Sequence, residues 1–151
     1  MANHQTDTIT IREMQPADAE SVAQLTTELG YERSAADIRA WIERSGAVRE
    51  RQIAFVACLD EEVVGWIEVS LERRLQSPDF ALIGGLVVSR DQRSHGIGRL
   101  LCEHAAAWSW ERGAAKLRVT SRSTRADAHR FYTREGFETV KTSMVFEKKR
   151  P

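Results

Sequence analysis

The chain is organised around the stretch Arg93-Ser94-His95-Gly96-Ile97-Gly98. It follows an apolar run from Phe80 to Val88 and precedes a helical pattern that continues to about Arg112. A strand, a glycine-containing turn and a helix start bring backbone N–H groups together, and the helix dipole favours negative charge there. The sequence therefore predicts an anion-binding turn, although glycines open many such turns for steric reasons alone.

Two common phosphate-binding motifs do not fit this turn. The dinucleotide fingerprint needs a third glycine at the proper spacing and a β-α-β unit at the start of the chain, and both are missing. A P-loop ends in Gly-Lys-Ser or Gly-Lys-Thr, which is also missing. The remaining prediction is pyrophosphate binding outside a Rossmann fold.

The length and charge of the chain limit its organisation and its partners. Its 151 residues suit one domain, with a flexible leader at 1–7 and a solvated basic tail at 148–151. The 22 basic residues balance the 22 acidic ones, so we expect neither nucleic acid nor a membrane surface as a partner. No apolar run reaches the roughly 18 residues of a membrane span, and we expect a cytoplasmic protein.

The two cysteines predict neither a disulfide nor a metal site. Cys58 lies in an apolar strand-like run and Cys102 in a helical pattern, and neither has the spacing of a metal ligand. We expect two free thiols and no bound metal.

Periodicity predicts a mixed α/β domain with the order β-α-α-β-β-β-α-β-α-β and helices on both faces of the sheet. The expected strands cover 8–12, 53–59, 63–71, 80–88, 116–121 and 139–147, and the expected helices 18–29, 34–46, 98–112 and 125–135. Gly84 and Gly85 predict a bulge in the fourth strand. His104 is expected in the core, and Trp110 on the surface.

A second motif lies at Phe131-Tyr132 and Gly136-Phe137. The two phenylalanines suit a core, and the glycine suits a helix end. Tyr132 lies at the edge of the helical stripe, where its phenol could donate a proton to a leaving thiolate, or could simply pack in the core.

At their spacing, the two motifs resemble those of the GNAT superfamily of N-acetyltransferases. The stretch from Leu86 to Gly98 is similar to the strand and the Arg/Gln-x-x-Gly-x-Gly signature of that family. The stretch from Ala128 to Phe137 is similar to its second motif, and the element order matches. The resemblance covers the chain from about Thr8 to Lys148 and implies a mostly antiparallel sheet that splays at the cofactor.

The resemblance implies acetyl-CoA as the cofactor. Backbone amides would wrap its pyrophosphate at Arg93, Ser94, His95, Gly96, Ile97, Gly98 and Arg99. Leu86, Val87 and Val88 would pair with the pantetheine arm as an added strand does. Tyr132 matches the general acid of the family and would touch the cofactor. Arg125, where many members have Asn, could reach a CoA phosphate or remain solvated.

The general base is harder to identify, because the run from Phe80 to Val88 has no carboxylate. An ammonium substrate must lose a proton before it attacks a thioester. Glu68 is the first candidate, because it would share a strand face with Trp66 and Ser70, although a solvated carboxylate is an equal alternative. The other candidates are Glu72, Asp79, His95 and His129.

The acceptor is expected to be a primary amine that attacks directly in a ternary complex, because neither cysteine lies in a nucleophile motif. Four residues would suit a cationic, partly apolar amine, namely Tyr31, Glu32, Trp41 and Asp79. A small amine, an aminoglycoside-like polyamine and a protein amine stay open, as do longer acyl groups and a homodimer. Two other classes also stay open: a non-catalytic acyl-CoA sensor, and a structural partner protein that uses Trp110.

Overall fold

The computed structural model describes residues 8–93 and 95–151. The chain divides into two compact units, Met1–Val119 and Thr120–Pro151, and each is described by itself. The expected leader at 1–7 and the candidate Ser94 lie outside the described residues. Within the described part, no helix has both the length and the apolar character of a membrane span.

The first unit is built on a five-stranded sheet in the order β1-β2-β3-β4-β5. Neighbouring strands are antiparallel except β4 and β5, which are parallel. The bounds are β1 Ile9–Glu13, β2 Gln52–Leu59, β3 Glu62–Arg74, β4 Ser77–Val88 and β5 Leu117–Val119. The predicted mixed, mostly antiparallel sheet is therefore confirmed.

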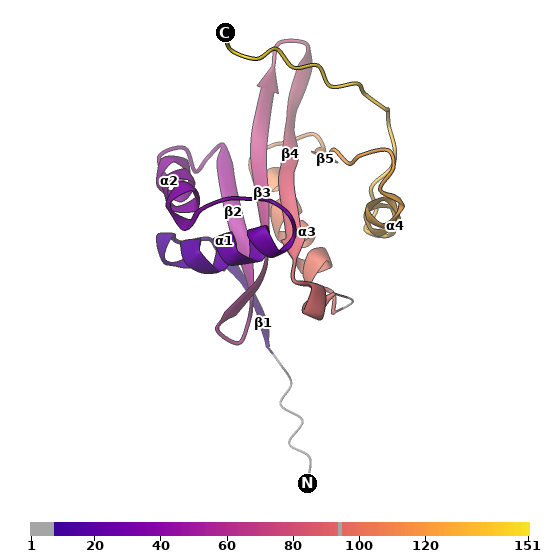
Figure 1. Ribbon diagram of the computed structural model, residues 1–151. Coiled ribbons are helices and arrows are strands. Elements are labelled where there is room, and N and C mark those ends of the chain that lie inside the picture. The colour runs from indigo at the N-terminus through magenta and orange to yellow at the C-terminus, as the bar shows by residue number, and fades with distance from the viewer. Residues whose placement is uncertain (1–7, 94) are drawn as a thin grey trace. The chain divides into compact units, whose positions relative to one another are not determined.

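Helices cover both faces of this sheet (Figure 1). The bounds are η1 Pro16–Asp18, α1 Ala19–Glu28, α2 Ala35–Gly46, η2 Arg90–Gln92 and α3 Ile97–Glu111. α1 and α2 pack on one face, and α3 packs on the other. Ser34 caps α2 as its sequence predicts, because its Oγ accepts a hydrogen bond from the Asp37 N–H at 3.0 Å.

Each helix layer buries its apolar stripe against alternate residues of the strands. Val22 of α1 and Ile42 of α2 pack with Val56 on one face. On the other face, Ile97 and Leu101 of α3 are buried against the sheet. Burying side chains of this size stabilises the fold by about 1.5–3 kcal/mol each, so the two stripes fix the helices on the sheet.

Four side chains of the first unit test the predicted core. Cys58 and Cys102 are buried and not joined in a disulfide, as expected. Trp110 is exposed, also as expected. The prediction for His104 is wrong: the residue is exposed, its Nδ1 lies 3.1 Å from the Leu100 carbonyl, and its ring meets the edge of Phe55. A position at the border of the helical stripe lets the polar ring reach solvent.

β4 carries the predicted bulge. Glu68 of β3 lies opposite Gly85, whereas the next residue, Val69, lies opposite Ile83. Gly84 is therefore the extra residue. The ladder with β5 covers only the three β4 residues from Ala81 to Ile83. Beyond the bulge, β4 has no strand on that side within the described sheet.

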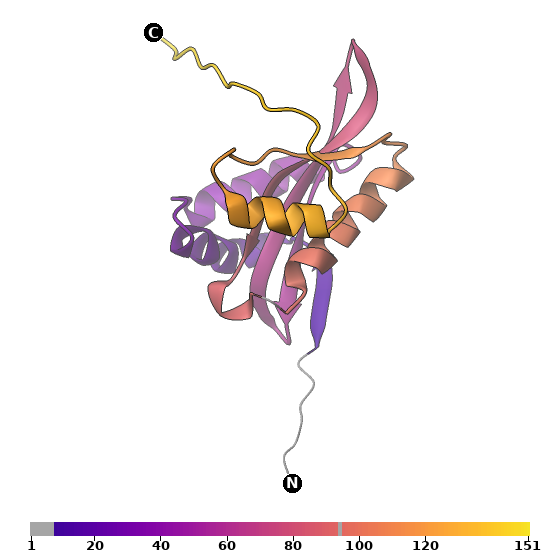
Figure 2. The same cartoon turned by 90° about the vertical axis from the view of Figure 1, so that its right-hand side faces the viewer.

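The strands expected at 63–71 and 80–88 are both longer than predicted. β3 runs on to Arg74, β4 already starts at Ser77, and these two residues pair across a tight hairpin. Pro78 is tolerated because the register is irregular there and no ladder pair involves it. Figure 2 shows the tip of this hairpin projecting beyond the rest of the sheet.

The second unit contains α4, Ala126–Arg134, which ends before Gly136 at a φ of 92°. The strand expected at 139–147 is not formed, and residues 138–151 have no helix or strand. Residues 139–147 have the composition of a strand, but a strand also needs a neighbouring strand with which its backbone can form hydrogen bonds. The second unit, residues 120–151, contains no strand that could be such a neighbour.

Candidate active site

Glu68 lies at the centre of the sheet face that α1 and α2 cover. The neighbouring Trp66 donates from its Nε1 to the Thr26 Oγ1 at 3.0 Å, which ties this strand to α1. The Glu68 side chain is half-buried, and Gln52 of β2 donates from Nε2 to its Oε1 at 3.3 Å. Burial raises the pKa of the Glu68 carboxyl above its ordinary value, and the hydrogen bond from Gln52 acts in the opposite direction.

The bulge makes room for this carboxylate. A Cβ at Gly84 would lie 2.5 Å from the Glu68 Oε2, and a Cβ at Gly85 would lie 2.8 Å from the Trp66 ring. A bulge sets two residues against one on the opposing strand, so both glycines approach side chains of β3. Any larger residue would displace Glu68 or Trp66.

The other carboxylates considered as bases have nearby partners. Glu72 accepts a hydrogen bond from the Ser70 Oγ at 3.0 Å. Asp79 pairs with Arg73 at 3.4 Å near the hairpin tip. Burial raises the pKa of Glu68, which is the direction that suits a proton acceptor near neutral pH.

The turn before α3 has the geometry that an anion site requires. Gly96 is the N-cap residue with a φ of 77°, in the left-handed region that favours glycine. The first hydrogen bond of the helix runs from the Leu100 N–H to the Gly96 carbonyl at 3.1 Å. The backbone N–H groups of the first helical turn therefore have no partner within the helix, and a Cβ at Gly96 would meet nothing within 4 Å. These features fit a pyrophosphate.

The remaining residues of the expected pyrophosphate turn are placed as follows. Arg93 ends η2, and its N–H donates to the Arg90 carbonyl at 3.5 Å. His95 is exposed, and Ile97 is buried at the start of α3. Gly98 lies in the first turn of the helix, and Arg99 pairs with Glu103 at 3.1 Å.

The end of β4 fits an extended ligand. Val87 is buried, and Leu86 and Val88 are half-buried. These residues pair with β3 on one side, and no strand of the described sheet covers the other side. An extended arm could add there as a strand does, which agrees with the predicted position of pantetheine.

The second unit holds two other candidates, Tyr132 and Arg125. The Tyr132 ring makes edge contacts with the rings of Phe131 and Phe137, with centroids 5.2 and 5.5 Å apart. Arg125 is the exposed N-cap residue of α4. His129, which was also considered as a base, has its Nε2 2.8 Å from the Arg122 carbonyl.

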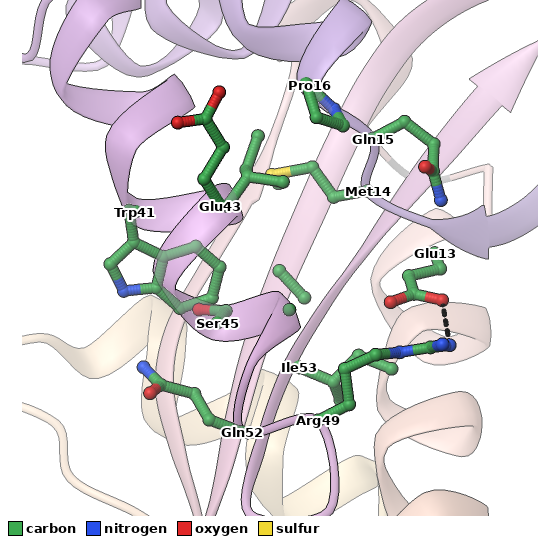
Figure 3. A pocket seen from close by; sticks show the side chains of 13 residues that line it. Glu13, Met14, Gln15, Pro16, Trp41, Glu43, Ser45, Arg49, Gln52 and Ile53 are labelled. Atoms are coloured by element: carbon green, nitrogen blue, oxygen red, sulfur yellow. Dashed lines mark hydrogen bonds and ion pairs between the residues drawn. The ribbon is translucent and has the colours of Figure 1, made fainter.

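The four acceptor candidates are distributed over separate elements of the first unit. Tyr31 and Glu32 are exposed in the connection between α1 and α2, and Asp79 lies in β4. Trp41 of α2 packs on the core and also lines a cavity of about 270 Å³ (Figure 3). No hydrogen bond or ion pair joins these four side chains within the part of the chain that the structure describes.

Trp41 shares this cavity with Gln52, the residue that donates a hydrogen bond to Glu68. Glu43 also lines the cavity, and Glu13 and Arg49 form an ion pair at its opposite end (Figure 3). Because Gln52 both lines the cavity and donates to Glu68, a ligand in the cavity would lie next to the hydrogen bond that holds this carboxylate.

Two contacts of Glu68, with Gln52 and with Gly84, were not predicted from the sequence. Gln52 was overlooked because the hydrogen bond to Glu68 depends on the register between β2 and β3. The only indication of Gln52 in the sequence is that a polar residue stands at the start of an apolar strand. Gly84 was recognised as a bulge, but its contact with the Glu68 carboxylate depends on three-dimensional geometry.

Comparison with known proteins identifies the family. The model of the acetyltransferase (GNAT) family matches residues 17–137, so the chain belongs to this family. The aminoglycoside N(6')-acetyltransferase type 1 of Stenotrophomonas maltophilia is 30% identical over 141 residues, which cover 91% of each chain. An uncharacterized N-acetyltransferase of Bacillus subtilis (strain 168) is 28% identical over 129 residues, or 84% of this chain and 85% of that one.

Solved structures show the same fold. An aminoglycoside N-acetyltransferase in complex with CoA superposes with a TM-score of 0.85 at 16% identity, over 99% of this chain and 100% of that one. The glucosamine-6-phosphate N-acetyltransferase from Arabidopsis thaliana gives a TM-score of 0.83 at 15% identity, over 94% and 99% of the two chains. At this identity, the likeness concerns the fold alone.

Family membership confirms three predictions. The chain is a GNAT acetyltransferase, it is an enzyme that transfers an acyl group to nitrogen, and its cofactor is acetyl-CoA. The alternatives of a non-catalytic sensor and of a purely structural partner protein are therefore set aside.

Proposed function

We propose that this N-acetyltransferase moves an acetyl group from acetyl-CoA to a primary amine of a small molecule by direct attack in a ternary complex. The observation that carries this proposal is the half-buried Glu68 carboxylate, which lies against the bulge glycine Gly84 where the open edge of β4 begins. Both cysteines are buried, which supports direct attack over an acyl-enzyme route.

Each step of the reaction has a candidate group in this chain. Bound acetyl-CoA supplies the activated acetyl group as a thioester. Glu68 removes a proton from the acceptor ammonium, so that the neutral amine can attack. A backbone N–H near Leu86 or Val87 stabilises the negative charge that develops on the carbonyl oxygen. Tyr132 donates a proton to the leaving sulfur.

The acceptor is proposed to be a cationic small molecule of the aminoglycoside type. This proposal rests on the 30% identical relative, whose name gives an aminoglycoside as its substrate. The cavity lined by Gln52, which donates to Glu68, supports it, because Trp41 offers an aromatic face and Glu43 a carboxylate to a cation. Tyr31, Glu32 and Asp79 are proposed to contribute further contacts.

A panel of acceptors tests the function. The protein is mixed with acetyl-CoA and, in turn, an aminoglycoside, a simple polyamine and a lysine-containing peptide, while release of free thiol is followed. We expect turnover with the aminoglycoside or the polyamine and little with the peptide. Turnover confined to the peptide would contradict a small-molecule acceptor, and the absence of turnover with every amine would contradict the proposed reaction.

Gln52→Leu is expected to change the pH dependence of the reaction. The hydrogen bond from Gln52 favours the charged carboxylate, so its loss raises the pKa of Glu68 further. Since a base acts only when deprotonated, the acidic limb of the kcat/KM profile should move to higher pH, with the plateau at alkaline pH retained. Gln76→Leu, at the exposed hairpin tip, is the matched control. An unchanged limb would show that Gln52 does not act on the base.

Tyr132→Phe is expected to lower kcat by about 10²-fold or more while leaving CoA affinity nearly intact, because it removes only the phenol hydroxyl group. The variant keeps the ring that packs between Phe131 and Phe137. Steady-state kinetics and calorimetric titration with CoA measure the two effects separately. A variant with the parental kcat would assign the proton to water or to another group.

A further inference from the structure

The indole of Trp66 lies directly over the bulge of β4. Trp66 stands two residues before Glu68 on β3, so the two side chains share one face of the sheet. A Cβ at Gly85 would lie 2.8 Å from the Trp66 Cη2 atom and 2.9 Å from its Cζ3 atom. The outer edge of the indole therefore fills the space next to Gly85, as the Glu68 carboxylate fills the space next to Gly84.

The opposite edge of the indole is anchored in α1. Its Nε1 donates to the Thr26 Oγ1 at 3.0 Å, and this hydroxyl donates in turn to the Val22 carbonyl at 2.6 Å. Thr26 is buried, and the indole packs against the core between the helices and the sheet. Moving the ring away from Gly85 would break a buried hydrogen bond and leave a polar group without a partner, which is costly. The indole is thus fixed at both edges.

The open part of the β4 edge is short. β5 pairs with β4 as far as Ile83, and the pantetheine arm is proposed to pair with Leu86 to Val88. Only Gly84 and Gly85 lie between these two stretches, an interval of roughly 10 Å from Ile83 to Leu86. The end of the arm, the thioester and the acyl group have to fit there. A longer acyl chain has to leave the plane of the sheet toward one of its faces.

The face under α3 is closed to such a chain. Ile83 and Leu86 flank the bulge on β4, and their partners on β3 are Val69 and Ile67. Ile67, Val69 and Ile83 are at most 4% exposed. A chain that entered this face would overpack a core that is already filled. The other exit is the face that α1 and α2 cover, where the indole lies.

We propose that Trp66 restricts this enzyme to short acyl groups, because its indole occupies the space into which a longer chain would extend from Gly85. This inference rests on the position of the thioester in the proposed function. An acetyl group ends beside Gly85, whereas a longer chain meets a ring that Thr26 holds in place. Trp66 is therefore a specificity-determining residue for the acyl donor.

Calorimetric titration with CoA, acetyl-CoA and hexanoyl-CoA tests this inference without an acceptor. The parent chain should bind hexanoyl-CoA about tenfold or more weakly than acetyl-CoA, as is typical of a misfit in an apolar site. Trp66→Phe lacks the outer edge of the indole at Gly85 and should bind the two thioesters about equally well. Trp110→Phe makes the same change at an exposed side chain of α3 and should keep the parental difference. CoA without an acyl group is the reference and should bind each variant like the parent.

Thr26→Val tests the anchor separately. Valine has nearly the volume of threonine but cannot accept the indole N–H, so the difference between the two thioesters should become smaller than in the parent. Circular dichroism verifies that each variant folds.

Two results would overturn the inference: a parent chain that binds hexanoyl-CoA as tightly as acetyl-CoA, or a Trp66→Phe variant that keeps the parental difference. If Trp66→Phe does not bind CoA, Thr26→Val takes its place, and an unchanged difference in that variant would overturn the inference. Failure of the proposed reaction is distinguishable, because it appears as a lack of turnover with every amine, whereas the binding comparison involves no transfer.

Discussion

Glu68→Gln should lower kcat/KM by about 10²–10⁴-fold, which is the usual contribution of a general base. Glutamine keeps the size of the side chain and an oxygen that can accept the hydrogen bond from Gln52, so the change removes the charge and little else. The acidic limb of the pH profile should disappear with the base, because that limb reports deprotonation of a carboxyl whose pKa burial has raised. Steady-state kinetics across pH measure both effects, and CoA titration should give an unchanged affinity.

Two companion variants sharpen this test. Glu62→Gln makes the same change at an exposed position of the same strand and should leave the rate unchanged. Gly84→Ala keeps Glu68 but places a methyl group where its carboxylate now lies, 2.5 Å from the oxygen, so it should also lose activity. Parental activity in Glu68→Gln would assign the base to another carboxylate, with Glu72 the next to test.

Gly96→Asp should weaken CoA binding by about 100-fold while leaving the fold intact. An acidic group at a helix N-terminus stabilises the helix by about 0.3–1 kcal/mol. The same carboxylate would stand close to the pyrophosphate, where like charges near a protein surface repel by about 4 kcal/mol at 4 Å. The φ of 77° costs a non-glycine residue about 1–2 kcal/mol, which offsets the gain at the helix terminus, so CoA binding should fall far more than stability changes. Calorimetric titration with CoA and thermal unfolding measure them.

The controls for Gly96→Asp separate charge from backbone strain. Gly96→Asn has nearly the same shape, tolerates a positive φ and carries no charge, so it should retain most of the affinity. Gly113→Asp introduces the same residue at a φ of 76°, after the other end of α3, and should leave CoA binding unchanged. An Asp variant that binds CoA as well as the Asn variant would contradict the pyrophosphate assignment.

The elements that local chemistry determines were predictable from the sequence. The Gly96 turn and the Ser34 cap each require a particular residue at one position, so they could be located without a structure. The bulge at Gly84 was predictable for the same reason. The end of β3 was not predictable from the sequence. The residues up to Arg74 are held in the strand by pairing with β4, and their own composition does not favour a strand.

The candidate site was predictable only in part. Glu68 could be selected because alternation along a strand assigns its face, but its burial and its bond to Gln52 depend on the register of β2. The strand expected at 139–147 failed for a related reason. A strand pattern predicts the capacity to pair, but it does not predict whether a partner is present.

The bulge at Gly84 also determines to which face of the sheet the side chains of β4 point. Before it, Ala81 and Ile83 lie on the face that α3 covers, with Ile83 opposite Val69. After the bulge, the alternation of side chains between the two faces is shifted by one residue. Val87, which lies opposite Trp66, therefore points to the face that α1 and α2 cover. Deleting one glycine would exchange the faces of every residue from Leu86 onward. A single inserted residue thus lets the first half of β4 pack its side chains under α3 and the second half direct Val87 to the opposite face of the sheet.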